Sequence, residues 1–113
     1  MRETTVGSQL ASVTERLHGL IEGIERGDQP GREHIDETLT DGYACALALD
    51  AECRRLESRI SENAVHLGAE SGVEQALELS ALARLLTRRR RELDSLRDLL
   101  AVLRTGVHRA RVA

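Results

Sequence analysis

Apolar residues recur every 3.5 residues along two long segments of this chain, and this period limits the possible folds more than any other feature. In the first segment the two core positions hold Leu39, Ala46, Cys53, Ile60 and Leu67, and Gly42, Leu49, Leu56 and Asn63. In the second segment they hold Leu79, Leu86, Leu93, Leu100 and Val107, and Leu82, Arg89, Leu96 and Leu103. This period is typical of helices packed along a seam, so the sequence predicts two long paired α-helices.

Turn-forming residues divide the chain into three predicted helices, over residues 8–26, 33–67 and 72–105. The first helix carries its own apolar stripe, with Ser8 as the expected N-cap. We expect a turn at residues 27–31, a second turn at residues 68–72, and the end of the last helix at Thr105-Gly106. We expect residues 1–7 to be a flexible arm and residues 8–113 to form one helical domain.

The short connection between the two long helices predicts that they are antiparallel neighbours. The expected fold is all-α: a long antiparallel two-helix coiled-coil hairpin with a shorter N-terminal helix packed at its open end, which dimerises into a helical bundle. Pairing the helices from residues 67 and 73 outward fixes the register. In that register Ile60 faces Leu79 and Ser80, Cys53 faces Leu86, Ala46 faces Leu93, and Leu39 faces Leu100.

The composition excludes several classes of binding protein. Tyr43 is the one aromatic residue, so an aromatic platform for stacking nucleic-acid bases is excluded. The net charge is -3, so we expect no direct DNA binding. All sixteen basic residues are arginine, which indicates a GC-rich genome of the kind found in actinobacteria. There is no apolar run of about 18 residues and no signal-peptide pattern, so we expect a cytoplasmic protein that does not enter a membrane.

The run Arg88-Arg89-Arg90-Arg91 permits two interpretations. In the first it binds the phosphates of an anionic nucleotide, because the planar guanidinium group matches phosphate oxygens. That anion site would comprise Arg88, Arg89, Arg90, Arg91, Asp50 and Arg54. In the second interpretation the run is an ion-paired helix face, with Arg88 bound to Glu92, Arg91 to Asp94, and Arg89 to Asp50 across the seam. The last pair would fix the register.

No pattern of catalytic or metal-binding residues emerges from the sequence. The four histidines are scattered, and no two of them are spaced to share a metal ion. Cys45 and Cys53 are too few for a disulfide framework and are expected to be reduced thiols. A glycine-rich phosphate loop and a nucleophile elbow are both missing. We therefore expect a protein that is not an enzyme and uses no cofactor or metal.

Several apolar residues lie off the predicted seam and indicate a partner surface. This expected interface comprises Leu47, Val65, Val73, Leu77, Ala81 and Leu99. The simpler alternative is that they are ordinary scattered surface residues. The leading hypothesis is a non-enzymatic interaction protein that forms a homodimer and binds a protein partner. The competing hypothesis is a small-ligand sensor whose arginines, from two protomers, hold an anionic nucleotide.

The predicted helical hairpin resembles two families in outline. It is similar to flagellar and type III export chaperones, in which an antiparallel pair of helices binds a helix of the client protein. It also looks like small actinobacterial anti-sigma factors, whose hairpins bind a cyclic dinucleotide through Arg, Gln and Asp side chains. The resemblance covers the outline and no residue motif. It implies either sequestration of a transcription factor such as a sigma factor, or a role as adaptor or chaperone.

Overall fold

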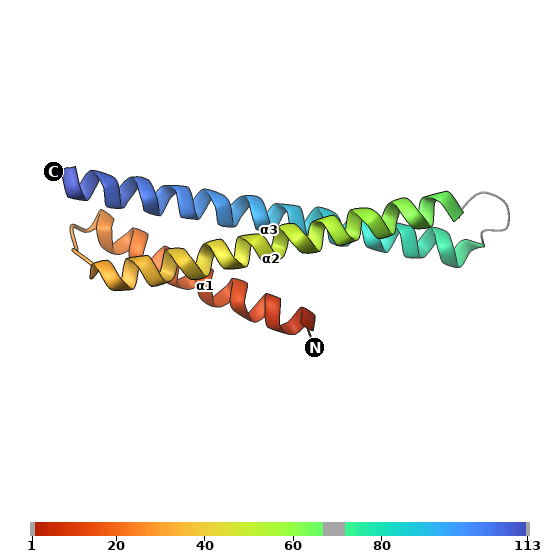
Figure 1. Ribbon diagram of the computed structural model, residues 1–113, viewed down its shortest axis with the longest axis horizontal. Helices are drawn as coiled ribbons and strands as arrows, with labels where there is room; N and C mark the ends of the chain where they lie inside the picture. Colours follow the sequence, from red (N-terminus) through yellow and green to blue (C-terminus); the bar gives the residue numbers. More distant parts are fainter. Residues whose placement is uncertain (1, 67–71, 113) are drawn as a thin grey trace. The chain divides into compact units, whose positions relative to one another are not determined.

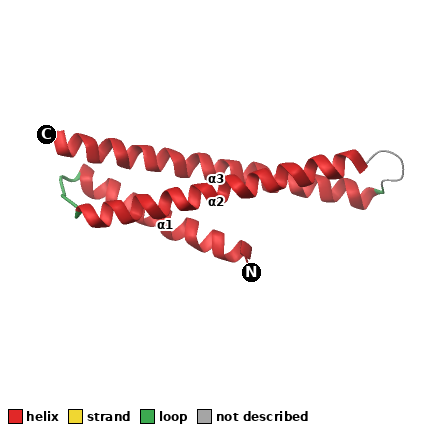
Figure 2. Cartoon of the chain, viewed as in Figure 1, coloured by secondary structure: helices red, strands yellow, loops and turns green. Residues whose placement is uncertain are grey.

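The computed structural model has three α-helices, α1 (Arg2–Glu25), α2 (Arg32–His66) and α3 (Val73–Val112) (Figure 1). It describes the backbone of residues 2–66 and 72–112, and the side chains of residues 7–66 and 72–111. Within these residues all regular structure is helical, and Figure 2 shows no strand. The all-α expectation is confirmed, and so is the pairing of the two long helices. The turn predicted at residues 68–72 lies almost wholly outside the described residues, as do Leu67 and Met1.

The turn between α1 and α2 follows the Schellman pattern of helix termination. The amide of Asp28 donates to the carbonyl oxygen of Gly23 at 2.8 Å, and the amide of Gly27 donates to that of Ile24 at 3.0 Å. Gly27 has a φ of 89°, which a residue without a Cβ adopts at little cost. The first helix ends at Glu25, one residue before the predicted position 26, and the geometry of this turn sets how α2 returns toward α1.

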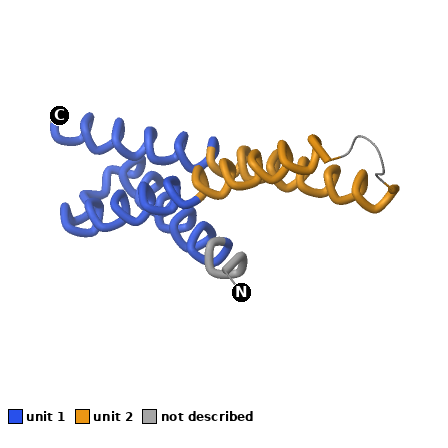
Figure 3. The backbone as a smooth tube through the Cα atoms, turned by 45° about the vertical axis from the view of Figure 1, so that its right-hand side comes forward, with its two compact units in different colours: residues 1–48, 94–113 blue, residues 49–93 orange. Residues whose placement is uncertain are grey.

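Contacts divide the chain into two compact units, shown in blue and orange in Figure 3. Unit 1 contains Met1–Ala48 and Asp94–Ala113, so all three helices contribute to it. Its buried apolar residues are Val13, Leu17, Leu20, Ile35, Cys45, Ala46, Leu96, Leu100, Leu103 and Val107. A polar contact also joins α1 to α2, because Arg16 donates to Asp41 at 2.9 Å and to the buried Thr38 at 3.3 Å.

Unit 2 contains Leu49–Leu93 and is built from α2 and α3 alone, which run in opposite directions (Figure 3). Its core cluster consists of Cys53, Leu56, Leu82 and Leu86, with Ile60 and Leu85 packed against it. Cys53 and Leu86, which the predicted register places face to face, thus belong to the same cluster. Burial raises the pKa of the Cys53 thiol above its ordinary value, so the thiol stays protonated at neutral pH.

Two helix ends differ by several residues from their predicted positions. α1 begins at Arg2 and includes Ser8. Serine is favoured at the N-cap but does not prevent a helix from continuing through it. α3 continues past Thr105-Gly106 to Val112. The backbone at Gly106 approaches Ile24 of α1, and Val107 in the next position is buried, so packing holds this last stretch helical. Gly106 therefore permits close packing and does not stop the helix.

Two glycines inside helices are expected to respond in opposite directions to alanine. A Cβ at Gly42 would lie 2.6 Å from Cδ2 of the buried Leu100, so Gly42→Ala overpacks unit 1 and should lower the melting temperature. A Cβ at Gly106 would lie 3.6 Å from Ile24, an ordinary contact. Gly106→Ala should therefore raise stability by up to about 1 kcal/mol through helix propensity. Thermal unfolding followed by circular dichroism checks both signs, and a stabilising Gly42→Ala would contradict the close packing.

Candidate functional site

The structure separates the four consecutive arginines into paired and unpaired side chains. The Arg89 side chain is only 12% exposed and lies between two carboxylates. Its Nε donates to Oε1 of Glu52 on α2 at 2.9 Å, and its Nη1 donates to both oxygens of Glu92 at 3.0 and 3.1 Å. The prediction that Arg89 pairs with Asp50 is wrong, because the long arginine side chain reaches Glu52. Glu92 likewise binds Arg89 in place of the expected Arg88.

The environment of Arg89 keeps it charged. Burial by itself lowers the pKa of this guanidinium group, but the hydrogen bonds and negative charges of Glu52 and Glu92 outweigh that effect and raise the pKa. Two carboxylates therefore neutralise a cation that occupies a core position of the seam. The Arg89–Glu52 contact joins α2 to α3, and burial leaves Arg89 little surface for an external anion.

Two other members of the predicted anion site are also paired. Arg90 donates to Glu57 at 2.6 Å across the two helices, and Arg54 lies 3.2 Å from Asp50 on the same helix. These pairs are exposed at their arginine ends, so each contributes little to stability. The structure thus brings Arg89, Arg90 and Arg54 to carboxylates of the chain itself.

Arg88 and Arg91 instead lie with Arg84 on the exposed side of α3. With Ala83 and Thr87 they line a shallow hollow of about 430 Å³ in unit 2. Within the part of the chain whose side chains are described, these three arginines form no ion pair. Arg88 and Arg91 are therefore the members of the basic run that, together with the nearby Arg84, remain able to meet an anionic group from outside.

Five of the six residues of the predicted interface are exposed. The exposed fractions are 72% for Leu47, 79% for Val65, 77% for Val73 and 61% for Leu77, and Ala81 is also exposed. Leu99 is half-buried. Leu47 and Leu99 belong to unit 1 and the other four residues to unit 2.

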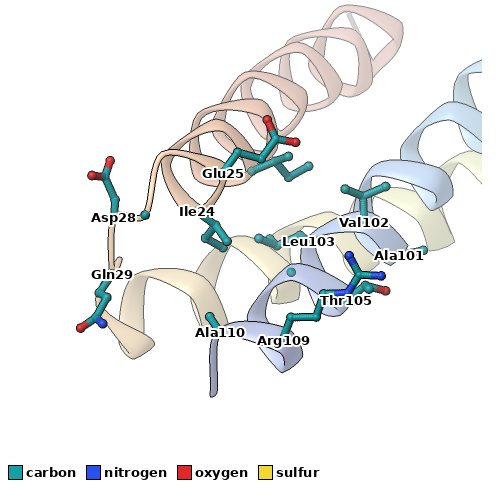
Figure 4. Close-up of a pocket in the computed structure, with 13 residues that line it drawn as sticks. Ile24, Glu25, Asp28, Gln29, Ala101, Val102, Leu103, Thr105, Arg109 and Ala110 are labelled. Carbon is teal, nitrogen blue, oxygen red and sulfur yellow. The ribbon is translucent and has the colours of Figure 1, made fainter. Parts of the chain in front are cut away.

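Unit 1 contains a groove of about 780 Å³ between the C-terminal parts of α1 and α3, which we call the α1–α3 groove. Ile21 and Ile24 form its α1 side, and Ala101, Val102, Leu103, Thr105, Gly106 and Ala110 form its α3 side. Figure 4 shows Ile24 and Leu103 pointing toward one another across it. Three charged side chains, Glu25, Asp28 and Arg109, complete the lining together with Gly27 and Gln29.

This groove was not predicted from the sequence, although Leu103 of its lining is one of the predicted core positions. The groove is lined by residues of α1, of the turn at Gly27 and of α3, and Val102 within it is half-exposed. A signal is present in the sequence, since Val102 lies off the α3 seam on the side that an added helix would cover. The position of Val102 alone does not predict the distance between α1 and α3, on which the groove depends.

No family model, curated protein or solved structure matches the chain. Among the described residues no three His, Cys, Asp or Glu side chains are placed to hold a metal ion. None of the three helices, over the part that is described, has the length and apolar character needed to cross a membrane.

Proposed function

We propose that this chain is a non-enzymatic interaction protein that binds an α-helix of a protein partner in the α1–α3 groove and also associates with itself. The observation that carries the proposal is the groove, with hydrocarbon walls from Ile21, Ile24 and Val102. Amphipathic helices bind in such grooves through apolar side chains spaced three and four residues apart. Burial of apolar surface is the main favourable contribution in most protein association, and the hydrocarbon lining offers such surface.

The charges of the groove give such a partner a preferred direction. Glu25 lies at the end of α1, whereas Arg109 comes from α3; Asp28 in the turn is already paired with Arg26 at 3.3 Å. A bound helix with basic residues at one flank and acidic residues at the other would meet opposite charges on both sides. The expected partner is a cytoplasmic protein that exposes an amphipathic helix, such as a sigma factor held inactive or a client held by an adaptor.

A photocrosslinking amino acid at Val102 tests this proposal, with Ser58 as the control because it is exposed on α2 in unit 2. We expect the Val102 probe alone to label one apolar helical segment of a partner. That segment, made as a peptide, should bind the purified protein. Val102→Glu should weaken the binding about 30-fold, as loss of a central apolar anchor does, and Ser58→Glu should leave it unchanged.

The same experiment has a clear negative outcome. If both probes label the same proteins equally, or if the labelled segment binds Val102→Glu as tightly as the unchanged chain, the groove is not a partner site. Circular dichroism of each variant confirms that the helices remain folded. The assay needs no knowledge of the partner beforehand.

The nucleotide-sensor hypothesis has weaker support. An anion held by Arg89, Arg90 and Arg54 would have to displace Glu52, Glu92, Glu57 and Asp50 from them. Binding of a cyclic dinucleotide, measured by calorimetry, and its loss in Arg89→Ala/Arg90→Ala, would restore that hypothesis.

A further inference from the structure

One face of α3 in unit 2 changes from apolar to basic along the helix. We call it the α3 stripe, and it consists of Leu77, Ala81, Arg84, Arg88 and Arg91. All five residues are exposed. At 100° per residue they fall within an arc of about 80°, so they form one continuous surface. Its first two residues are apolar and its last three are arginines without an ion pair among the described side chains.

One face of α2 in unit 1 has the opposite character. We call it the α2 stripe, and it consists of Glu33, Glu37, Thr40, Ala44 and Leu47. These residues are also exposed and also span an arc of about 80°. Glu33 and Glu37 form no ion pair among the described side chains, nor does the adjacent Asp36. Asp41 beside them is held by Arg16, and Arg32 is the basic residue at this border.

The two stripes match each other when they are laid antiparallel. Successive members of both stripes are spaced three or four residues apart, so five pairs can form in one register. Apolar residues then face apolar residues, and glutamates face arginines. The facing pairs are Leu47 with Leu77, Ala44 with Ala81, Thr40 with Arg84, Glu37 with Arg88, and Glu33 with Arg91.

We propose that the α2 stripe of one copy of this chain docks antiparallel on the α3 stripe of a second copy. The inference rests on the self-association included in the proposed function, and it names the two surfaces. Leu47 and Leu77, exposed to 72% and 61%, supply the apolar contact. The charged halves supply direction, because a parallel alignment would set Glu33 beside Leu77 and Arg91 beside Leu47.

The charge pattern also disfavours the simpler pairing of two identical stripes. Two α3 stripes laid parallel would bring Arg84, Arg88 and Arg91 against the same arginines, and laid antiparallel would set arginine against leucine. Two α2 stripes would oppose glutamates in the same way. Each copy instead carries one stripe of each kind, so the contact joins unlike surfaces.

Charge reversal tests the inference, using sedimentation velocity over a concentration series at low ionic strength. We expect Glu37→Arg and Arg88→Glu each to weaken self-association about tenfold, because each turns an attraction into a repulsion. An equimolar mixture of the two variants should recover the original association, since opposite charges then meet again between positions 37 and 88. The chain carrying both substitutions should recover it as well.

Matched controls carry the same charge changes outside both stripes. Arg55→Glu and Glu62→Arg alter exposed residues of α2 in unit 2 and should leave association unchanged. If the stripe variants behave like these controls while the original chain associates, the copies meet elsewhere, and only the choice of surfaces is overturned. If the original chain stays monomeric at about millimolar concentration, self-association itself is overturned, while partner binding in the α1–α3 groove stands on its own test.

Discussion

Arg89→Leu is expected to lower the free energy of unfolding by about 2–4 kcal/mol. The substitution removes the cation that Glu52 and Glu92 share, and their side chains are only 16% and 24% exposed. Both carboxylates then remain close together at the α2–α3 seam with no opposite charge. Desolvation and mutual repulsion act against the folded state, so the loss exceeds that of an ordinary surface ion pair.

Urea unfolding followed by circular dichroism measures this loss, and two variants identify its cause. Arg90→Leu removes a more exposed pair, with Glu57, and should cost less than about 1 kcal/mol. Adding Glu52→Leu to Arg89→Leu should recover part of the lost stability, because it removes one of the two uncompensated carboxylates and their mutual repulsion, while Glu92 stays without a partner. Equal losses for Arg89→Leu and Arg90→Leu would mean that the ion pairs of Arg89 with Glu52 and Glu92, which we call the Arg89 bridge, contribute no more to stability than an exposed pair.

Leu17→Ala is expected to cost about 2–5 kcal/mol by leaving a cavity in unit 1. Leu17 has no exposed surface, and unit 1 has Leu100 and Leu103 almost fully buried in the same core. Truncation removes the outer carbons of the side chain, and the packed helices cannot close over the space that they leave. This loss of stability is expected only if α1 is part of the packed core of unit 1.

Leu47→Ala is the matched control, because it makes the same chemical change on α2 where 72% of the side chain is exposed. Its effect on the unfolding free energy should stay within about 0.5 kcal/mol. Both variants are compared by thermal and urea unfolding at a protein concentration low enough to keep association from contributing. If Leu17→Ala unfolds like Leu47→Ala, α1 is not part of the cooperative core.

The pairing of α2 with α3 can be predicted from the sequence because the residues buried along their seam recur at a regular 3.5-residue spacing. Cys53, Leu56, Leu82 and Leu86 can be assigned to a core from spacing alone, and they form the cluster of unit 2. The partner of Arg89 cannot be assigned in this way. Asp50 and Glu52 are two residues apart on α2, and because a long flexible side chain can reach either carboxylate, packing and solvent exposure decide between them.

Helix ends and the groove depend on contacts between distant residues. Gly27 and Gly106 read alike in the sequence, yet one ends a helix with a positive φ and the other lies within α3. At Gly106 the helix continues into a packed stretch, since Val107 is buried and Ile24 of α1 lies close to Gly106. The α1–α3 groove is lined by residues of α1, of the following turn and of α3, so it becomes visible only after unit 1 is assembled.

The Arg89 bridge also penalises sliding of one long helix along the other. A seam of repeated leucines alone tolerates a shift by seven residues, since apolar groups meet apolar groups again. Such an offset would replace Glu52 by Arg59 in one direction and by Cys45 in the other. The first brings two cations together and the second leaves Arg89 without its interhelical carboxylate, so one alignment is selected from an otherwise repetitive pattern.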